Sequence, residues 1–440
     1  MAYLPNIIFA MLLVAGVWFF SKNVKKIYRN IQLGKAVDTA GHTPQRWNNM
    51  FRIALGQTKM VVRPIPGILH IIVYVGFIII NLEVLEIILD GLLGTHRIFS
   101  FLGGFYSFLI GSFEILAFLV IVAVALFWVR RNILKLRRFL NPEMAGWPKK
   151  DGNLILYIEF ILMLFFLTMN AADYQLQQMD VAHYTKAGAF PVSQFLSPLF
   201  QGMSISGIIA VERTAWWLHI TGILFFLNYL YYSKHLHILL AFPNTYFGKI
   251  GPKGKFDNLD AVTKEVRLMM DPGVDPYAAP DGDAAIEKFG ASDVMDLDRV
   301  QLLNAYTCTE CGRCTSECPA NITGKKLSPR KIMMDTRDRL EEVGRNIDAN
   351  KGKFVPDGKQ LLGDYITAEE LWACTTCNAC VEACPVSIDP LSIIMDMRQY
   401  LVMEQSAAPS DLNNMMGNIE NNGAPWPFNQ MDRLNWSKEP

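Results

Sequence analysis

The chemistry of this chain is concentrated in eight cysteines, all of which fall in one stretch of the 440 residues. They form two runs with the same spacing, C-x2-C-x2-C-x3-C, and each run is followed by a proline (Pro319 and Pro385). Thiolates are soft ligands that suit iron–sulfur clusters, and the tight spacing wraps a loop around one cluster face. Structural zinc needs only two close cysteine pairs, and disulfides need no fixed triplet. The spacing therefore favours two [4Fe-4S] clusters over either alternative.

The same spacing is typical of bacterial two-cluster ferredoxins, in which the last cysteine of each run binds the other cluster. Each predicted ligand set thus joins three cysteines of one run to the last cysteine of the other. The two sets are Cys308, Cys311, Cys314 with Cys384, and Cys374, Cys377, Cys380 with Cys318. No cysteine remains for a disulfide. Because cluster thiolates favour a reducing compartment, we expect this half of the chain to face the cytoplasm.

The composition indicates a membrane half joined to a soluble half. Hydrophobic residues make up 51% of the chain and charged residues 19%, while the formal net charge is zero, which implies no general attraction to nucleic acid. About 20 apolar residues cross a bilayer as a helix. Five stretches reach or approach this length, and together they predict an all-α, five-helix membrane domain over residues 1–242. These stretches are 4–20, 67–89, 107–129, 154–172 and 215–240.

Loop charges predict the orientation of these spans. Segments 21–66 and 130–153 contain nine and seven Lys or Arg residues, whereas loops 90–106 and 173–213 together contain three. Cytoplasmic loops carry the excess of Lys and Arg, so we expect the N-terminus outside and everything after the fifth span in the cytoplasm. This agrees with the compartment that the cysteines favour. It predicts a multi-pass protein of a prokaryotic cytoplasmic membrane with a cytoplasmic ferredoxin domain.

Histidines at the ends of the spans could hold a b-type haem. His70 lies near the cytoplasmic start of span 2, while His219 and His237 bracket span 5, eighteen residues or about five helical turns apart. Spans 2 and 5 are antiparallel, so His70 and His237 are expected at the same depth, where two imidazoles could bind haem iron. The alternative is that each histidine merely caps a helix end. His235 is interpreted as a neighbour without a role, although fraying of one helical turn could exchange its role with that of His237.

The membrane half resembles the cytochrome b subunit of respiratory nitrate reductase and its heterodisulfide-reductase-associated relatives. The matching triplets are Leu69-His70-Ile71, Leu218-His219-Ile220 and Leu236-His237-Ile238. The resemblance implies a haem b on His70 and His237. Two-haem members carry a further histidine where this chain has Ile80. His219 could therefore be left over, bind a second haem with His96 or His183, or face a quinone headgroup.

Four acidic side chains fall within the apolar spans. Glu83 and Glu86 lie toward the outer end of span 2, Glu114 toward that of span 3, and Glu159 near the inner end of span 4. Ionisable residues at membrane depth are costly, so they either form interhelical hydrogen bonds or have a task. A quinone site needs a proton donor near a ring oxygen. The four acids and His219 are candidates for that role.

The remainder divides into a mostly irregular linker (243–291), a helical ferredoxin domain (292–403) and a C-terminal tail (404–440). A short helix is expected around 259–270, and Thr367 with Glu370 forms the capping-box pattern ahead of the second cysteine run. The long segment between the runs resembles the helical ferredoxin type of succinate dehydrogenase and heterodisulfide reductase subunits. The basic run Lys325, Lys326, Arg330 and Lys331 is expected to be a solvated face or a docking patch.

Residues 411–440 resemble the junction in longer membrane iron–sulfur oxidoreductases, which continue into a domain with two Cys-Cys-Gly motifs. The chain ends at Pro440 without such a pair, so we expect that domain on a partner subunit bound by the tail. The resemblance implies an electron-transfer subunit of a quinone oxidoreductase. It would use two clusters, one haem b or two, and a flavoprotein or other cytoplasmic donor. The alternatives are a haem-free membrane anchor, a redox sensor, and a complex in which quinol reduces a heterodisulfide or sulfur acceptor.

Overall fold

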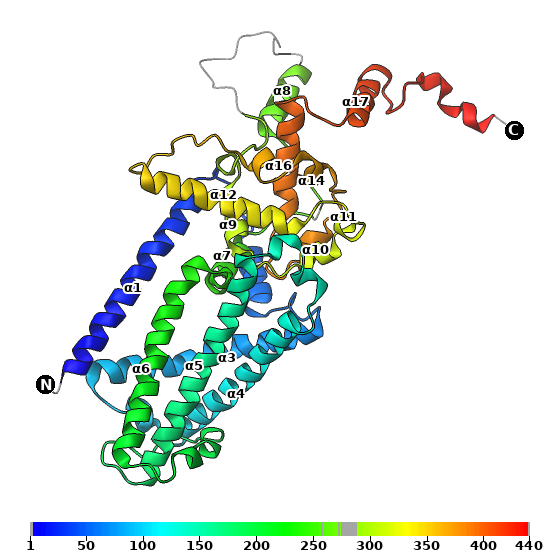
Figure 1. The fold of residues 1–440 in the computed structure, drawn as a ribbon. Coiled ribbons are helices and arrows are strands. Elements are labelled where there is room, and N and C mark those ends of the chain that lie inside the picture. Colours follow the sequence, from blue (N-terminus) through cyan, green and yellow to red (C-terminus); the bar gives the residue numbers. More distant parts are fainter. Residues whose placement is uncertain (1–2, 253, 257, 272, 274–287, 439–440) are drawn as a thin grey trace.

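The computed structural model describes residues 3–252, 254–256, 258–271, 273 and 288–438. Within these residues the regular structure is helical, and the only β contacts are two isolated bridges. The long helices of the N-terminal half lie below a compact group of short helices from the C-terminal half (Figure 1). The predicted all-α class is therefore confirmed for the described part of the chain.

Among the residues that the structure describes, four helices are long and apolar enough to cross a membrane, and they contain the first four predicted spans. Pro64 opens the second of these helices, where its fixed φ suits a first helical turn, and Gly94 ends it in the left-handed conformation. A fifth helix, α6 (Ile205–Tyr229), packs against α5 and α1 but lies outside this apolar group. The four are α1 (Leu4–Ile31), α3 (Pro64–Leu93), α4 (Gly104–Asn132) and α5 (Trp147–Gln178).

The prediction of one continuous helix over 215–240 is wrong. Helix α6 ends at Tyr229, Ser233 adopts an extended conformation, and a new helix, α7 (His237–Phe247), begins at His237. Asp151 of α5 provides the physical reason. Its carboxylate accepts hydrogen bonds from the Ser233 hydroxyl at 2.7 Å and from the Lys234 amide at 3.2 Å. These bonds hold the chain out of a helix, so His219 and His237 do not share one helical face.

Helix α1 extends well beyond the predicted span and joins the two halves. Figure 1 shows it running along the membrane bundle and ending beside α12. Its last turns contact the ferredoxin half, where Arg29 pairs with Asp348 and the Asn30 amide donates to the Tyr306 hydroxyl at 2.9 Å. Gly344 permits this approach, because a Cβ at that position would lie 2.4 Å from the Asn30 side chain.

The ferredoxin half consists of short helices arranged around the two cysteine runs. The predicted capping box is confirmed, since Thr367 and Glu370 exchange side-chain-to-backbone hydrogen bonds at the start of α14. The helix expected around 259–270 is present as α8. The remaining helices are α2 (Thr43–Asn49), α8 (Asp260–Met270), α9 (Arg299–Thr307), α10 (Arg313–Glu317), α11 (Pro319–Ile322), α12 (Pro329–Ala349), α13 (Leu361–Asp364), α14 (Ala368–Trp372), α15 (Ala379–Ala383), α16 (Pro390–Met403) and α17 (Ser410–Asn422).

One residue of the predicted solvated basic run is instead completely buried. Arg330 has no exposed side-chain surface, and its guanidinium donates to the Arg138 carbonyl at 2.6 Å and to the Glu143 carboxylate at 2.7 Å. Both partners lie in the loop between α4 and α5. Arg330 therefore attaches the ferredoxin half to the membrane half, while Lys326 remains exposed and pairs with Glu369.

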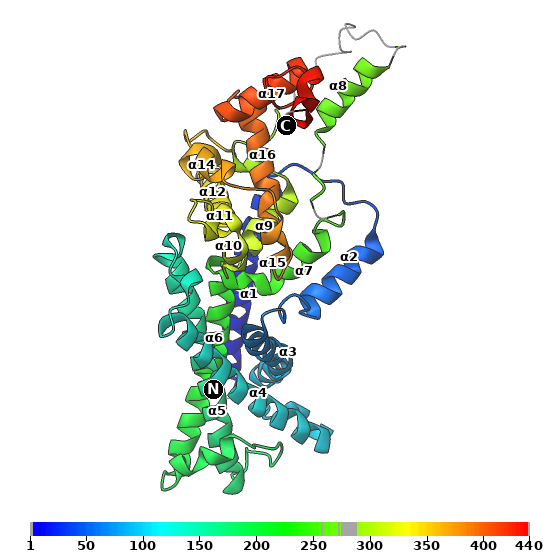
Figure 2. The ribbon, with the colours of Figure 1, turned by 90° about the vertical axis from the view of Figure 1, so that its right-hand side faces the viewer.

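The C-terminal segment stands away from the body of the molecule. Figures 1 and 2 show α17 and the residues after it beyond the end of α16. No residue of α17 is buried. Large apolar side chains that follow are exposed, among them Phe428, Met431 and Trp436. This part of the predicted tail contributes little to the core.

A buried arginine on α12 provides a stability prediction. Arg339 is fully buried and donates to Asp293 at 2.7 Å and Asp357 at 2.6 Å. Its replacement by methionine leaves both carboxylates unpaired, so we expect a loss of about 3–5 kcal/mol in the free energy of unfolding. Urea unfolding followed by the visible iron–sulfur absorption measures this loss. Arg345→Met, which removes an exposed pair with Glu341 on the same helix, should change stability by less than about 1 kcal/mol.

Candidate functional site

The two cysteine runs adopt matching backbone conformations. In the first run, Glu310 and Gly312 have positive φ angles of 56° and 71°; in the second, Thr376 and Asn378 have 55° and 60°. Left-handed residues at the same two positions give the two loops the same pair of turns. Gly312 is required for a further reason, because a Cβ there would lie 2.5 Å from the Arg330 guanidinium.

The structure brings cysteines of the two runs close together. Cys308, Cys311, Cys314 and Cys384 line one cavity, which Cys380 also reaches. Cys374 lies close enough to Cys318 and Cys377 to interact electrostatically, and Cys380 interacts with Cys374 and Cys318. All eight thiols are free. Thiols from the two cysteine runs therefore lie close together, although the runs are far apart in the sequence.

Burial shapes the chemistry of these thiols. Burial, together with a smaller contribution from neighbouring thiols, raises the pKa of Cys308 and of Cys380 to about 12. Such thiols are not reactive nucleophiles at neutral pH, because nucleophilicity requires the thiolate. They ionise when a positively charged group binds them. The donor set therefore fits an iron–sulfur cluster and not thiol catalysis.

The first cysteine group lies against the membrane half. Arg313, between Cys311 and Cys314, donates to the Lys59 carbonyl at 3.1 Å and the Met60 carbonyl at 3.2 Å. In return, the Lys59 ammonium donates to the Cys384 carbonyl at 3.2 Å. These contacts involve the loop before α3. The loop with the largest excess of basic residues and the cysteine domain thus lie at the same end of the bundle.

The second cysteine group lies nearer the surface. Cys377 is exposed, whereas no cysteine of the first group is. Arg398 of α16 holds this run by donating to the Leu371 carbonyl at 2.6 Å and the Cys374 carbonyl at 2.5 Å. Its guanidinium also lies over the Trp372 ring at 4.8 Å. Trp372 therefore packs against the arginine that holds this run.

The two histidines predicted to hold haem lie together. The ring centres of His70 and His237 are 6.5 Å apart, with an angle of 44° between the rings. Two imidazoles on one iron, each with a metal–nitrogen bond of about 2 Å, have ring centres about 6 Å apart. His237 Nδ1 lies 3.1 Å from the Lys234 carbonyl, which leaves Nε2 for a metal, and His70 Nδ1 is buried without a partner. This arrangement fits a bis-histidine haem site.

A third histidine lies beside this histidine pair but has a different partner. The ring of His235 lies 5.5 Å from that of His237, and its Nε2 is 3.5 Å from a Glu159 oxygen. Glu159, a predicted quinone candidate, therefore lies beside the histidine cluster and forms an ion pair when His235 is protonated. The break before α7, which sequence reasoning missed, brings this group together.

A buried ion pair links the histidine segment to the first cysteine run. Glu310, between Cys308 and Cys311, pairs with Lys234 and also with Arg337, at 2.8 Å. Burial alone would raise the pKa of Glu310, but the two cations outweigh it and lower the pKa. The carboxylate is therefore ionised and fixes Lys234, whose carbonyl orients His237. Sequence reasoning assigned no role to either residue of this pair.

The remaining candidates lie elsewhere in the bundle. His219 is buried, its Nδ1 lies 2.9 Å from the Leu162 carbonyl, and its Nε2 has no partner. His96 and His183 approach each other, at 5.7 Å between ring centres, and in the described residues no ring contact joins either to His219. Glu86 accepts from Tyr106 and Phe99. Glu114 accepts from Val192 and Ser193, so these two acids act as hydrogen-bond acceptors that join elements.

Comparison with known proteins supports the cysteine assignment. Residues 307–388, which contain all eight cysteines, match the 4Fe-4S dicluster domain family. The chain is 29% identical over 462 residues to the probable iron-sulfur-binding oxidoreductase FadF of Bacillus subtilis, covering 98% of this chain and 61% of the relative. It is 26% identical over 449 residues to the EtfAB:quinone oxidoreductase of Syntrophomonas wolfei, covering 96% and 56%.

A third relative matches a shorter part of the chain. It is one component of the ferredoxin/F(420)H(2)-dependent CoB-CoM heterodisulfide reductase of Methanosarcina acetivorans, 30% identical over 120 residues, covering 27% of this chain and 60% of the relative. The chain spans between a half and two thirds of the length of these curated relatives. No solved structure matches it. The chain therefore carries a 4Fe-4S dicluster domain beside apolar membrane-type helices, and its homology to iron–sulfur oxidoreductases supports an electron-transfer role.

Proposed function

We propose that this chain is the membrane subunit that carries electrons between a cytoplasmic partner and membrane quinone. The observation that carries the proposal is the contact between the first cysteine group and the membrane half next to His70 and His237. Arg313 contacts residues 59–60 in the loop before α3, and Glu310 pairs with Lys234, whose carbonyl lies 3.1 Å from His237 Nδ1. Two [4Fe-4S] clusters and a haem b, bound by these residues, would supply one-electron carriers.

We further propose an order for the carriers, which the sequence left open. The exposed Cys377 makes the second cysteine group the side that faces a partner. The first group, with Lys59, Arg138 and Arg313 around it, faces the histidines. Positive charge stabilises a reduced cluster, so these cations would favour electron flow from the second group toward the first. This supports the direction in which a cytoplasmic donor reduces quinone.

The proposed setting is the cytoplasmic membrane of a prokaryote, with five spans including α6 and the ferredoxin half in the cytoplasm. The similarity to an EtfAB:quinone oxidoreductase supports quinone as the acceptor. The proposed partners are a flavoprotein donor and a polypeptide with Cys-Cys-Gly motifs, for which the exposed tail after α16 offers an apolar contact surface. The second candidate direction, from quinol to a heterodisulfide or sulfur acceptor, is favoured by the similarity to a component of a heterodisulfide reductase.

Reconstitution tests the proposed function. The full chain, placed in liposomes that contain menaquinone, is reduced with limiting dithionite, and the iron–sulfur absorption, the b-type band and quinol are followed in time. We expect the clusters to reoxidise as quinol forms, through a transient b-type signal. A haem-free membrane anchor would give reduced clusters with no b-type band and no quinol. A protein built for the reverse direction would oxidise added quinol faster than it reduces quinone.

A further inference from the structure

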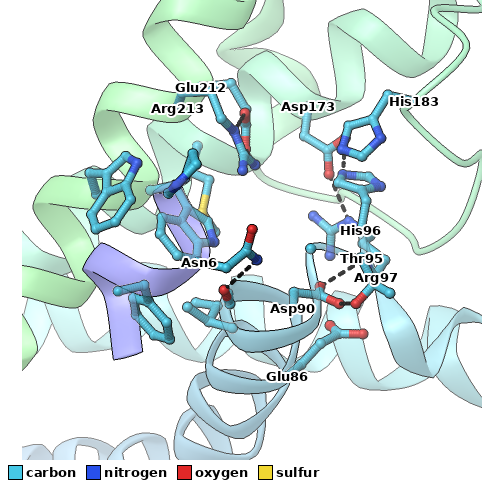
Figure 3. Close-up of a pocket in the computed structure, with 18 of the residues that line it drawn as sticks. Asn6, Glu86, Asp90, Thr95, His96, Arg97, Asp173, His183, Glu212 and Arg213 are labelled. Carbon is cyan, nitrogen blue, oxygen red and sulfur yellow. Dashed lines mark hydrogen bonds and ion pairs between the residues drawn. The ribbon is translucent and has the colours of Figure 1, made fainter. Parts of the chain in front are cut away.

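A cavity of about 430 Å³ lies at the end of the bundle opposite the cysteines. Figure 3 shows it between the first turns of α1, the end of α3, α6 and the loop that carries His96 and Arg97. It belongs neither to the cluster site nor to the His70–His237 site. By the topology proposed above, it opens toward the outer side of the membrane.

One wall of the cavity is aromatic. The Phe9 ring lies 5.4 Å from the Trp216 ring and 6.1 Å from the Trp217 ring, and the two indoles are 5.1 Å apart. Gly91 lets α1 approach this closely, because a Cβ at that position would lie 2.6 Å from Phe9. Large rings of this kind offer broad apolar contact to a flat aromatic ligand.

The other wall carries a fixed guanidinium. Arg97 is 6% exposed and donates to Asp173 at 2.6 Å, to Asn170 at 2.9 Å and to Tyr106 at 3.2 Å. The second Asp173 oxygen lies 3.3 Å from His96 Nε2. Figure 3 shows Arg97, His96 and Asp173 gathered on the same side of the cavity. This network holds the polar wall rigid without a ligand.

Two buried polar atoms on this wall have no partner. Glu83 is 3% exposed, its Oε1 lies 4.0 Å from Arg97, and its Oε2 accepts and donates no hydrogen bond. His96 Nδ1 is likewise buried and unpaired. An unpaired buried polar group costs about 1–3 kcal/mol in stability, so such a group calls for a partner from outside the chain, a water or a ligand. Both residues line the cavity.

These features select among ligand classes. The lining contains five carboxyl-bearing residues and two arginines, which disfavours an inorganic anion. Among the described residues that line this cavity, no three His, Asp or Glu side chains are arranged to hold a metal ion, which disfavours a cation. A flat ring with oxygen atoms on opposite edges fits this lining. The ring would pack against the aromatic side chains, and its oxygens would form hydrogen bonds with Glu83 and His96.

We propose that this cavity binds the headgroup of membrane quinone and that Glu83 exchanges a proton with it; this inference rests on the proposed function. Reduction of quinone to quinol consumes two electrons and two protons, and each carbonyl oxygen becomes a hydroxyl. The electrons come from the reduced iron–sulfur chain. Protonated Glu83 gives one proton to the nearer oxygen, and water at the outer mouth supplies the other and reprotonates Glu83. The protons therefore come from the outer side.

Photo-crosslinking tests the location. The full chain in detergent micelles is illuminated with an azido-naphthoquinone that carries a short alkyl tail, and the labelled peptides are identified. We expect labels on the first turns of α1, on α3 after Glu83 and around Trp216, and we expect excess menaquinone to suppress them. Labels confined to the opposite end of α3, near His70, would overturn the proposal, as would labels that menaquinone does not displace.

A matched pair of variants tests the role of Glu83. Glu83→Gln should lower the rate of quinone reduction at least about tenfold while the iron–sulfur and b-type spectra stay unchanged. Glu114→Gln is the control, since Glu114 is equally buried in a neighbouring helix but lies outside the cavity lining. Equal rates for the two variants would contradict a role for Glu83. If the azido-naphthoquinone labels the wild-type chain here but the chain never reduces quinone, the proposed function fails and the binding site stands.

Discussion

Replacement of His237 by alanine is expected to abolish the sharp b-type absorption band of the dithionite-reduced protein. His237 and His70 are the paired rings at 6.5 Å, and the loss of either removes one of two iron ligands. His70→Ala should have the same effect. The iron–sulfur spectrum should persist in both variants, because all eight cysteines are untouched. Reduced-minus-oxidised difference spectra of the purified variants measure the result.

Two control variants sharpen this test. His42 lies in an exposed loop and pairs with Gln45, so His42→Ala should keep the full band. His235→Ala should keep it too, because His235 lies beside Glu159 and not opposite His70. A band that survives in His237→Ala but disappears in His235→Ala would exchange the roles of these two residues. A band that survives every single replacement would remove haem from this site.

Paired cysteine replacements should reveal which residues share a cluster. If the ligand sets cross between runs, Cys308→Ala with Cys384→Ala damages one cluster only, and iron falls from about eight to about four atoms per chain. Cys374→Ala with Cys384→Ala then damages both clusters, and almost no iron remains. If each run instead holds its own cluster, the two double variants exchange these outcomes. Iron analysis and low-temperature EPR of the reduced proteins distinguish the two cases.

The cysteine spacing predicted ligand sets that cross between the runs, and the structure places Cys384 of the second run on one cavity with Cys308, Cys311 and Cys314 of the first. The pairing of His70 with His237 was also predicted, although through an incorrect helix. Hydropathy over 215–240 could not reveal the break, since its cause lies in Asp151, far away along the chain. A polar triplet, Ser233-Lys234-His235, inside an apolar run was the one local signal of that break.

The outer cavity could not be predicted from the sequence. Glu83 stood out as an acid in an apolar span, but its setting depends on Arg97, Asp173 and His96, which come from other elements. Glu86 and Glu114 have the same sequence character, and yet the structure gives them hydrogen-bond partners. Only tertiary contacts distinguish these two acids, which accept hydrogen bonds from other elements, from Glu83, whose nearest cation lies 4.0 Å away.

The length and contacts of helix α1 limit how far the ferredoxin domain can move. It passes from the outer end of the bundle to α12 as one uninterrupted rod of 28 residues, about 42 Å long, and it contacts both halves. A ferredoxin domain held by such a strut, and by Arg313, Arg330 and Lys234, cannot swing out to collect electrons and return. The distances between the proposed clusters and haem are therefore fixed by the fold. The rate of electron transfer between them should not depend on solvent viscosity. Only the encounter with the partner protein should be limited by diffusion.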